Sequence, residues 1–222
     1  MTTDAAILTA LRNAQNMGIS GAALSQQLGV SRAAIWARIE DLRRFGYEIE
    51  ASPHSGYRLI KSTSAIHPDD LTSRLGGNPV IGRDIRVFRE TTSTNDIAEK
   101  LAHDQVPEGV VVFAERQTKG RGRLSRRWES QAGLGLWFSI LLRPALPPQA
   151  ATRITITSAV SIARALRQST GLDTRIKWPN DIQIGGRKVA GILTEMTAET
   201  DRIRSLIIGI GLNVNQRPGD FS

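Results

Sequence analysis

A double glycine in the C-terminal part of the chain joins two segments that have the pattern of β-strands. Before it, Ile182 and Ile184 alternate with polar residues, and after Gly185–Gly186 residues 189–193 are mostly apolar. Apolar residues on both sides of a glycine pair are typical of an antiparallel hairpin. The sequence therefore predicts a β-sheet here, and any fold of the chain must contain it.

The residues that lead into this hairpin are Lys177–Asp181, which read Lys-Trp-Pro-Asn-Asp. One lysine supplies a point charge and three hydrogen-bond donors, so a strand that ends here suits an anion. An ordinary surface hairpin with Trp178 in the core is the competing interpretation of the same residues.

A second segment is rich in arginine and glycine. Residues 116–127 contain six basic side chains and no acidic one, with Gly120 and Gly122 between them. Glycine lets the backbone approach a ligand closely, and arginine offers a planar fork that fits phosphate or carboxylate. The segment lacks the Gly-Lys-Ser/Thr of a Walker loop. We expect a loop that a phosphorylated or carboxylated ligand orders; a solvated basic loop and a nucleic-acid contact are the alternatives.

The N-terminal region predicts three helices followed by a hairpin. Helical spacing of apolar residues covers 5–16, Ser20 caps a helix over 21–28, and Ser31 caps a third helix that runs through Arg44. Two short strands, 47–51 and 56–60, follow. This order is that of a winged helix-turn-helix, in which the second helix of the motif enters the major groove of DNA. A protein-interaction module is the alternative.

Residues of the second motif helix and of the wing are the candidates for DNA contact. The recognition helix and the wing supply Ser31, Arg32, Ala33, Trp36, Arg38, His54 and Arg58. Basic members of this set would contact phosphates.

The remaining segments predict a second unit that contains both strands and helices. Residues 80–89 have the pattern of a strand, 95–103 that of a helix capped by Ser93 or Thr94, and 154–167 that of an amphipathic helix. The nearly continuous apolar run 203–212 indicates a central strand. The predicted fold class is α+β, with a winged helix-turn-helix domain in residues 1–62 and a second domain in residues 63–222.

Composition excludes several kinds of site and location. The chain has no cysteine, and its three histidines show no metal spacing, so we expect no metal ligated by the protein. No run of about 18 apolar residues predicts a transmembrane helix. The net charge is +8, and its excess lies mainly beyond residue 62. A cytoplasmic protein without membrane contact is the expectation.

Seven motifs in order resemble the biotin protein ligases, specifically the branch with a winged helix that also represses the biotin operon. They are Thr92–Asn95, Gln117, Gly120–Arg123, Trp128, Lys177–Asp181, Lys188–Glu195 and Gly209–Asn215. The resemblance covers nearly the whole chain. It implies the mixed sheet, flanked by helices, of the biotin and lipoate ligases.

The resemblance also implies roles for individual residues. Biotin contacts are expected at Ser93, Thr94, Asn95, Gln117, Gly120, Arg121, Gly122, Arg123 and Lys177. Contacts to ATP or to the adenylate are expected at Arg126, Trp128, Asn180 and Asn213. Catalysis is expected from Lys177, Arg121 and Arg123, with Lys177 as the main electrostatic catalyst.

The reaction implied by the resemblance has two steps. Biotin and ATP, with Mg²⁺, give biotinyl-5′-AMP, and a lysine of the biotin carboxyl carrier domain of acetyl-CoA carboxylase then accepts the biotin. The adenylate is also the expected corepressor, which promotes a homodimer that binds operator DNA. A biotin-sensing regulator without catalysis and a lipoate or octanoate ligase are the alternatives.

Two features depart from the family pattern. Ser125 stands where the arginine-rich loop commonly has another glycine, so closure of the loop is expected to differ slightly. Members normally continue beyond the strand 209–215, and the chain is therefore expected to lack the C-terminal part.

Overall fold

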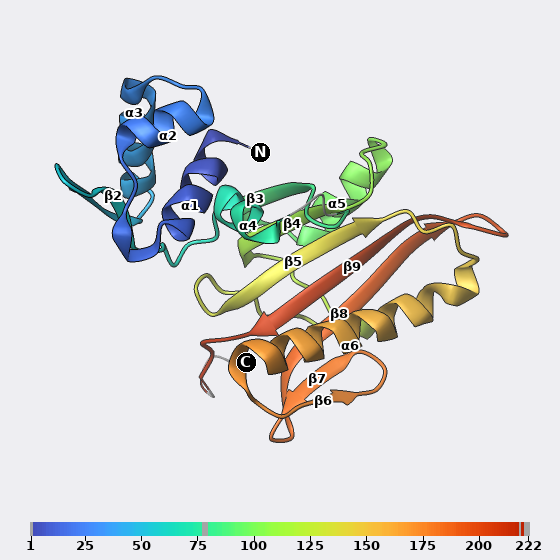
Figure 1. Cartoon of the computed structure of the whole chain (residues 1–222). Coiled ribbons are helices and arrows are strands. Elements are labelled where there is room, and N and C mark those ends of the chain that lie inside the picture. Colours follow the sequence, from blue (N-terminus) through green and yellow to red (C-terminus); the bar gives the residue numbers. More distant parts are fainter. Residues whose placement is uncertain (1, 77–79, 218, 220–222) are drawn as a thin grey trace. The chain divides into compact units, whose positions relative to one another are not determined.

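A computed structural model describes residues 2–76, 80–217 and 219 of the chain. Its contacts divide the chain into two compact units, residues 1–79 and residues 80–222 (Figure 1). Each unit has its own hydrophobic core. None of the helices in the described ranges is long and apolar enough to cross a membrane.

The first unit is a winged helix-turn-helix, as the sequence predicts. Its elements are α1 (Thr3–Asn13), η1 (Gln15–Met17), α2 (Gly21–Leu28), α3 (Arg32–Arg44), β1 (Glu48–Ser52), β2 (Gly56–Lys61) and α4 (Pro68–Leu75). Ser20 caps α2 and Ser31 caps α3, each by accepting a hydrogen bond from a backbone amide of the first turn. Gly29 ends α2 in the left-handed conformation that glycine adopts without strain.

Helix α4 belongs to the first unit, although the sequence analysis assigned residues 63–79 to the second domain. It packs on α1, where Thr2 Oγ1 donates a 2.5 Å hydrogen bond to Asp69 Oδ1 and Arg12 forms an ion pair with Asp70. These contacts join residues about 60 positions apart, so no local pattern predicts them.

Replacing Arg12 with alanine is expected to loosen the first unit. Asp70 is only 14% exposed and would lose its main cation, which costs about 2 kcal/mol of the free energy of unfolding. Amide hydrogen exchange at Ile35 and Ile39, buried in α3, measures this loss. Arg44→Ala, which breaks an exposed pair with Asp41, is the control and should cost less than about 0.5 kcal/mol. Equal exchange in both variants would contradict the role given to Arg12.

The second unit is a mixed seven-stranded sheet with a helix on each face. Its elements are β3 (Asp84–Thr91), α5 (Thr94–His103), β4 (Val110–Gln117), η2 (Arg123–Ser125), β5 (Gly135–Leu142), η3 (Pro148–Ala150), α6 (Ala151–Thr170), β6 (Thr174–Lys177), β7 (Asp181–Ile184), β8 (Arg187–Ala198) and β9 (Ile203–Asn213). The strand order is β3-β4-β5-β9-β8-β7-β6; among these described strands the pair β3–β4 is parallel and the other pairs are antiparallel. Strand β9 is thus central, as its apolar run predicts.

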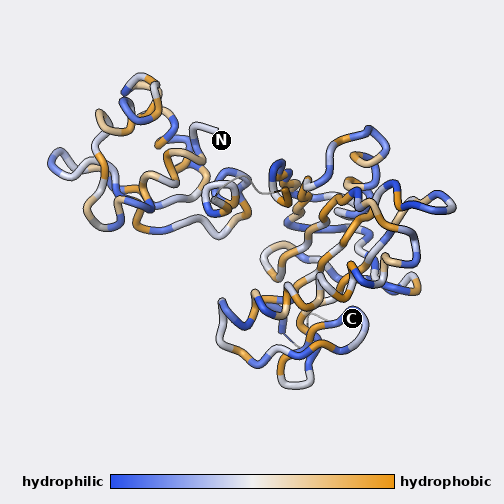
Figure 2. The backbone as a smooth tube through the Cα atoms, turned by 45° about the vertical axis from the view of Figure 1, so that its right-hand side comes forward, coloured by the Kyte–Doolittle hydropathy of each residue, from blue (hydrophilic) through white to orange (hydrophobic). Residues whose placement is uncertain are grey.

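The start of β3 differs from the prediction of a strand over residues 80–89. The strand begins at Asp84, because the chain turns at Gly82, which has a φ of 91°. The backbone N–H of Gly82 donates a hydrogen bond to the carbonyl oxygen of Gly109. Hydrophobic residues, orange in Figure 2, concentrate in the strands, and the loops at their ends are largely hydrophilic.

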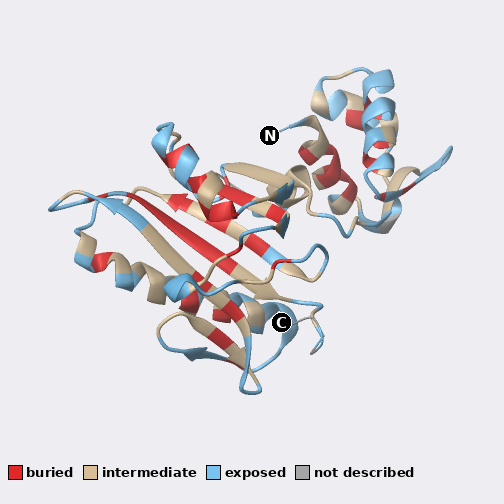
Figure 3. Ribbon diagram, turned by 180° about the vertical axis from the view of Figure 1, so that it is seen from behind, coloured by how far each residue is buried: buried red, intermediate tan, exposed pale blue. Residues whose placement is uncertain are grey.

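Alternation along β9 assigns its side chains to the two helices. Ile207 packs in the core formed with α5, whereas Leu206, Ile208 and Ile210 pack in the core formed with α6. Successive side chains of a strand point to opposite faces. Odd-numbered positions of β9 therefore face α5, and buried residues mark this strand along much of its length (Figure 3).

Candidate functional site

The second unit contains a cavity of about 600 Å³ on the face of the sheet that carries α5. Its floor consists of three glycines at positions that point to this face, namely Gly209 and Gly211 on β9 and Gly191 on β8. A β-carbon at Gly209 would lie 2.3 Å from Asn95 Oδ1, and one at Gly211 would lie 2.4 Å from the ring of Trp128. The glycines therefore leave the space that these side chains occupy.

One wall of the cavity is the N-terminal end of α5. Ser93, Thr94 and Asn95 are each about 3% exposed and line the cavity. Gln117 Oε1 accepts hydrogen bonds from the backbone amide of Thr94 (2.7 Å) and from its hydroxyl (3.1 Å), and Gln117 Nε2 donates to Ser130 Oγ (2.8 Å). The wall thus presents neutral donors and acceptors in fixed orientations, which suits a polar uncharged group of a ligand.

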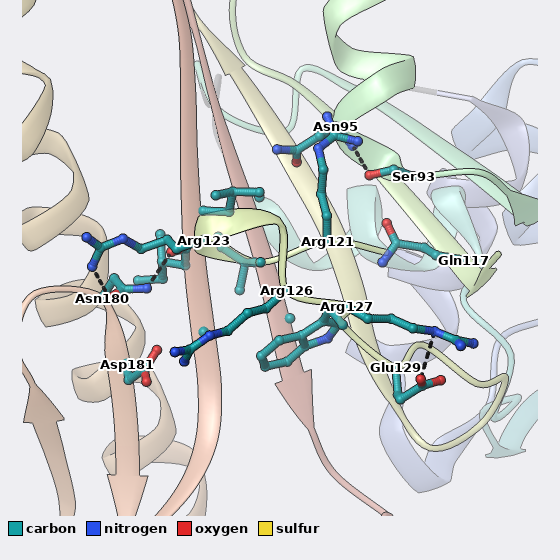
Figure 4. A pocket seen from close by; sticks show the side chains of 18 of the residues that line it. Ser93, Asn95, Gln117, Arg121, Arg123, Arg126, Arg127, Glu129, Asn180 and Asp181 are labelled. Carbon is teal, nitrogen blue, oxygen red and sulfur yellow. Dashed lines mark hydrogen bonds and ion pairs between the residues drawn. The ribbon is translucent and has the colours of Figure 1, made fainter. Parts of the chain in front are cut away.

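The arginine-glycine loop, residues 118–127, lies over the other side of the cavity (Figure 4). Its ends pair like a hairpin, with Gly122 N bonded to the carbonyl of Arg126 (2.7 Å) and Trp128 N bonded to that of Gly120 (3.0 Å). Ser125 has a φ of 57°, in the left-handed region that favours glycine. This is the position at which the sequence departs from the family pattern.

Cationic groups line the cavity from the loop and from β8. Arg123 Nη1 donates a 3.0 Å hydrogen bond to Asn180 Oδ1, and Arg126 lines the cavity from the same loop. Lys188 Nζ lies 2.8 Å from Asp181 Oδ1 and 5.0 Å from the centre of the Trp128 ring. An ammonium group held between a carboxylate and an aromatic face is well placed to receive an anionic ligand.

Most residues that the sequence analysis assigned to biotin and the nucleotide lie together around this cavity. The lining includes Ser93, Thr94, Asn95, Gln117, Arg121, Gly122, Arg123, Arg126, Trp128, Asn180 and Asn213. Gly120 is buried behind the lining, where a β-carbon would lie 2.4 Å from the carbonyl of Trp128. The close approach that we expect at Gly120 is therefore made to the backbone of Trp128.

Lys177 is the exception, because the structure does not place it at the cavity. It ends β6, the outermost strand of the sheet, where it is exposed and does not line the cavity. Trp178 is 73% exposed, so the alternative interpretation, which placed Trp178 in the core, is wrong. The cavity floor lies on β8 and β9, which β7 separates from β6, and Lys188 is the lysine that reaches it.

Three residues that organise this site have no role predicted from the sequence, namely Lys188, Glu195 and Ser139. Lys188 and Glu195 stand at the two ends of a motif that the resemblance did use. The alternating glycines Gly209 and Gly211, together with Gly191, could have predicted that one face of the central strands leaves room for a cavity.

The DNA-contact candidates of the first unit are mostly exposed. Ser31, the N-cap of α3, is exposed, as are Arg32, Ala33 and Trp36 in the first turns of the helix, and Trp36 is 59% exposed. His54 is exposed in the turn between β1 and β2. Arg38 lies 3.7 Å from Asp4, and Arg58 donates a 2.7 Å hydrogen bond to Glu50, so these two cations are partly neutralised.

Comparison with known proteins finds one family match within each unit. Residues 87–213 match the Biotin/lipoate A/B protein ligase family, and residues 4–58 match an HTH domain. The Bifunctional ligase/repressor BirA of Bacillus subtilis is 48% identical over 208 residues, which are 94% of this chain and 64% of that protein. The protein of the same name from Escherichia coli is 33% identical over 89% of this chain and 60% of its own length.

Among solved structures, the biotin protein ligase of Aquifex aeolicus in complex with biotin and ATP is similar in fold. The TM-score is 0.51 at 38% identity, over 61% of this chain and 54% of that one. The chain thus spans less than two thirds of the length of the curated relatives named above. The match over residues 87–213, on the unit that holds the cavity, shows that the chain belongs to the Biotin/lipoate A/B protein ligase family.

Proposed function

We propose that the second unit joins biotin to ATP to form biotinyl-5′-AMP and pyrophosphate. The observation that carries this proposal is the cavity itself, which combines a neutral polar wall with cations at Lys188, Arg123 and Arg126. The reaction brings a carboxylate against a phosphate, so it needs cations that offset their repulsion and hold both in place. The similar Aquifex protein was solved with biotin and ATP.

The arrangement suggests how the two ligands divide the cavity. Ser93, Thr94, Asn95 and Gln117 would hydrogen-bond the neutral ureido ring of biotin. Lys188 would lie beside the biotin carboxylate and the α-phosphate, in the role that the motif resemblance implies for Lys177. Trp128, Asn180 and Asn213 would contact the nucleotide.

Mg²⁺ would enter this site on the phosphates of ATP. In the described part of the chain, no three acidic or histidine side chains lie close enough together to hold a metal ion. Mg²⁺ commonly binds through substrate phosphates and a small number of carboxylates. Asp181, which lines the cavity, is a carboxylate that fits this arrangement.

The full protein is proposed to pass biotin to a lysine of the biotin carboxyl carrier domain of acetyl-CoA carboxylase and to repress transcription. The repressor half rests on the exposed face of α3, whose Arg32 and Trp36 would enter operator DNA while His54 approaches the backbone. A ligand-promoted homodimer would provide the two-fold symmetry that such operators share. The relatives named ligase/repressor agree with this proposal.

Biotin-dependent exchange of labelled pyrophosphate into ATP tests the first step. The expected result is exchange with biotin and none above background with lipoate or octanoate. Exchange with lipoate or octanoate instead would identify a ligase for those acids. Tight binding of biotin without exchange would identify a sensor without catalysis, and either result would overturn the proposal.

A further inference from the structure

Glu195 on β8 connects two parts of the candidate site that are far apart in the sequence. Its Oε1 accepts a 3.0 Å hydrogen bond from Arg121 Nε, and its Oε2 accepts one of 2.9 Å from Arg121 Nη2. The same Oε2 accepts a 2.6 Å hydrogen bond from Asn95 Nδ2. One carboxylate therefore holds both the arginine-glycine loop and the N-terminal end of α5.

Arg121 has a second carboxylate partner. Its Nη1 lies 2.5 Å from Asp96 Oδ1, on the first turn of α5. Hydrogen bonds to Glu195, and then to Asp96, raise the pKa of the Arg121 guanidinium above the ordinary value, at which arginine is already charged at physiological pH. With Nε, Nη1 and Nη2 all directed at carboxylates, the guanidinium serves as an attachment point of the loop, and it extends toward Asn95 in Figure 4.

Asn95 is fixed from both sides of its amide. Ser139 Oγ, which is fully buried on β5, donates a 2.5 Å hydrogen bond to Asn95 Oδ1, while Asn95 Nδ2 donates to Glu195. This pairing sets which end of the amide carries the donor and which carries the acceptor. A ligand in the cavity would meet the remaining N–H and lone pair in defined positions.

We propose that Glu195 is a positioning residue for the proposed adenylation. It orients Asn95 toward the ligand and, with Asp96, fastens Arg121 so that the loop lies over the cavity. The three side chains of this ion-pair cluster are 32–38% exposed, and multiple bonds within one network stabilise more than an isolated surface pair. The role in the reaction rests on the proposed function, whereas the fastening of the loop does not.

Limited trypsin digestion of the full chain without ligand tests the fastening directly. The loop offers cleavage sites after Arg123, Arg126 and Arg127, and Glu195→Gln is expected to speed cleavage there by about fivefold. Asp96→Asn should also speed cleavage, because it removes the second partner of Arg121. The matched control is Glu90→Gln, which breaks a half-exposed 2.8 Å pair with Arg116 at the base of the loop and should change the rate by less than about twofold.

Kinetics of pyrophosphate exchange test the positioning. Glu195→Gln is expected to raise the KM for biotin about tenfold with a smaller change in kcat, because both Asn95 and the loop lose their orientation. Asp96→Asn should raise this KM less, since Asp96 bonds Arg121 but not Asn95. A purely structural role predicts instead that both variants lose the same fraction of kcat at unchanged KM.

The two assays separate the two proposals. Unchanged trypsin cleavage in both Glu195→Gln and Asp96→Asn, with thermal unfolding like that of the wild type, would overturn the fastening whatever the protein catalyses. Faster loop cleavage in a protein whose wild type shows no biotin-dependent exchange would support the fastening and overturn the proposed function. Faster cleavage with an unchanged KM for biotin would overturn the positioning of Asn95.

Discussion

Lys188→Ala is expected to lower the rate of biotin-dependent pyrophosphate exchange by about 100-fold to 1000-fold. The Lys188 ammonium lies in the cavity, 2.8 Å from Asp181 Oδ1 and over the Trp128 ring. Without it, the carboxylate of biotin and the α-phosphate would meet with one fixed cation fewer between them. Lys188→Arg should recover only part of the rate, because a planar fork does not reproduce a compact point charge.

Lys177→Ala is the matched control for this experiment. The two lysines stand eleven positions apart in motifs that are equally prominent in the sequence, but Lys177 is exposed on the edge strand β6 and outside the cavity. Its removal should change the exchange rate by less than about threefold. A large loss in Lys177→Ala with a normal rate in Lys188→Ala would contradict the assignment.

Gly211→Ala is expected to close the floor of the cavity. The added methyl would lie 2.4 Å from Trp128 Cε2 and Nε1, and the ring has little room to move because Gly191 is beneath its other end. Overpacking of this kind costs about 1–3 kcal/mol of the free energy of unfolding, and here it should also weaken nucleotide binding by at least about tenfold. Thermal unfolding and equilibrium titration with ATP measure the two effects.

Gly122→Ala controls for the loss of a glycine as such. Gly122 has a φ of −116°, and a β-carbon there would come no closer than 3.7 Å to the carbonyl oxygen of Arg126. Its unfolding temperature should equal that of the wild type. If Gly211→Ala unfolds like Gly122→Ala and binds ATP normally, the glycines of β9 do not define the cavity.

Local signals account for the parts of the fold that the sequence predicts correctly. Helices α2 and α3 have the predicted bounds, because Ser20, Gly29 and Ser31 act within one turn of the chain. The place of β9 in the centre of the sheet follows from its continuous apolar run. Helix α4 was assigned to the other domain because its partners on α1 are distant in the sequence.

The cavity lining was largely predictable, but the choice of lysine was not. The motif resemblance identifies which residues surround a site. It does not show how far each strand lies from the floor of the cavity. Only the strand order puts β7 between β6 and the glycine-rich strands, and only that order separates Lys177 from Lys188. The paired roles of Glu195 and Asn95, 100 residues apart, likewise depend on the folded sheet.

A crystal structure of the chain with biotin and a non-hydrolysable ATP analogue would show which lysine meets the two ligands. We expect the biotin ring to contact Thr94 and Asn95, and its carboxylate and the α-phosphate both to lie within hydrogen-bond distance of Lys188 Nζ. Ligands bound outside the cavity, or a carboxylate held at Lys177 with Lys188 still paired only to Asp181, would contradict this expectation.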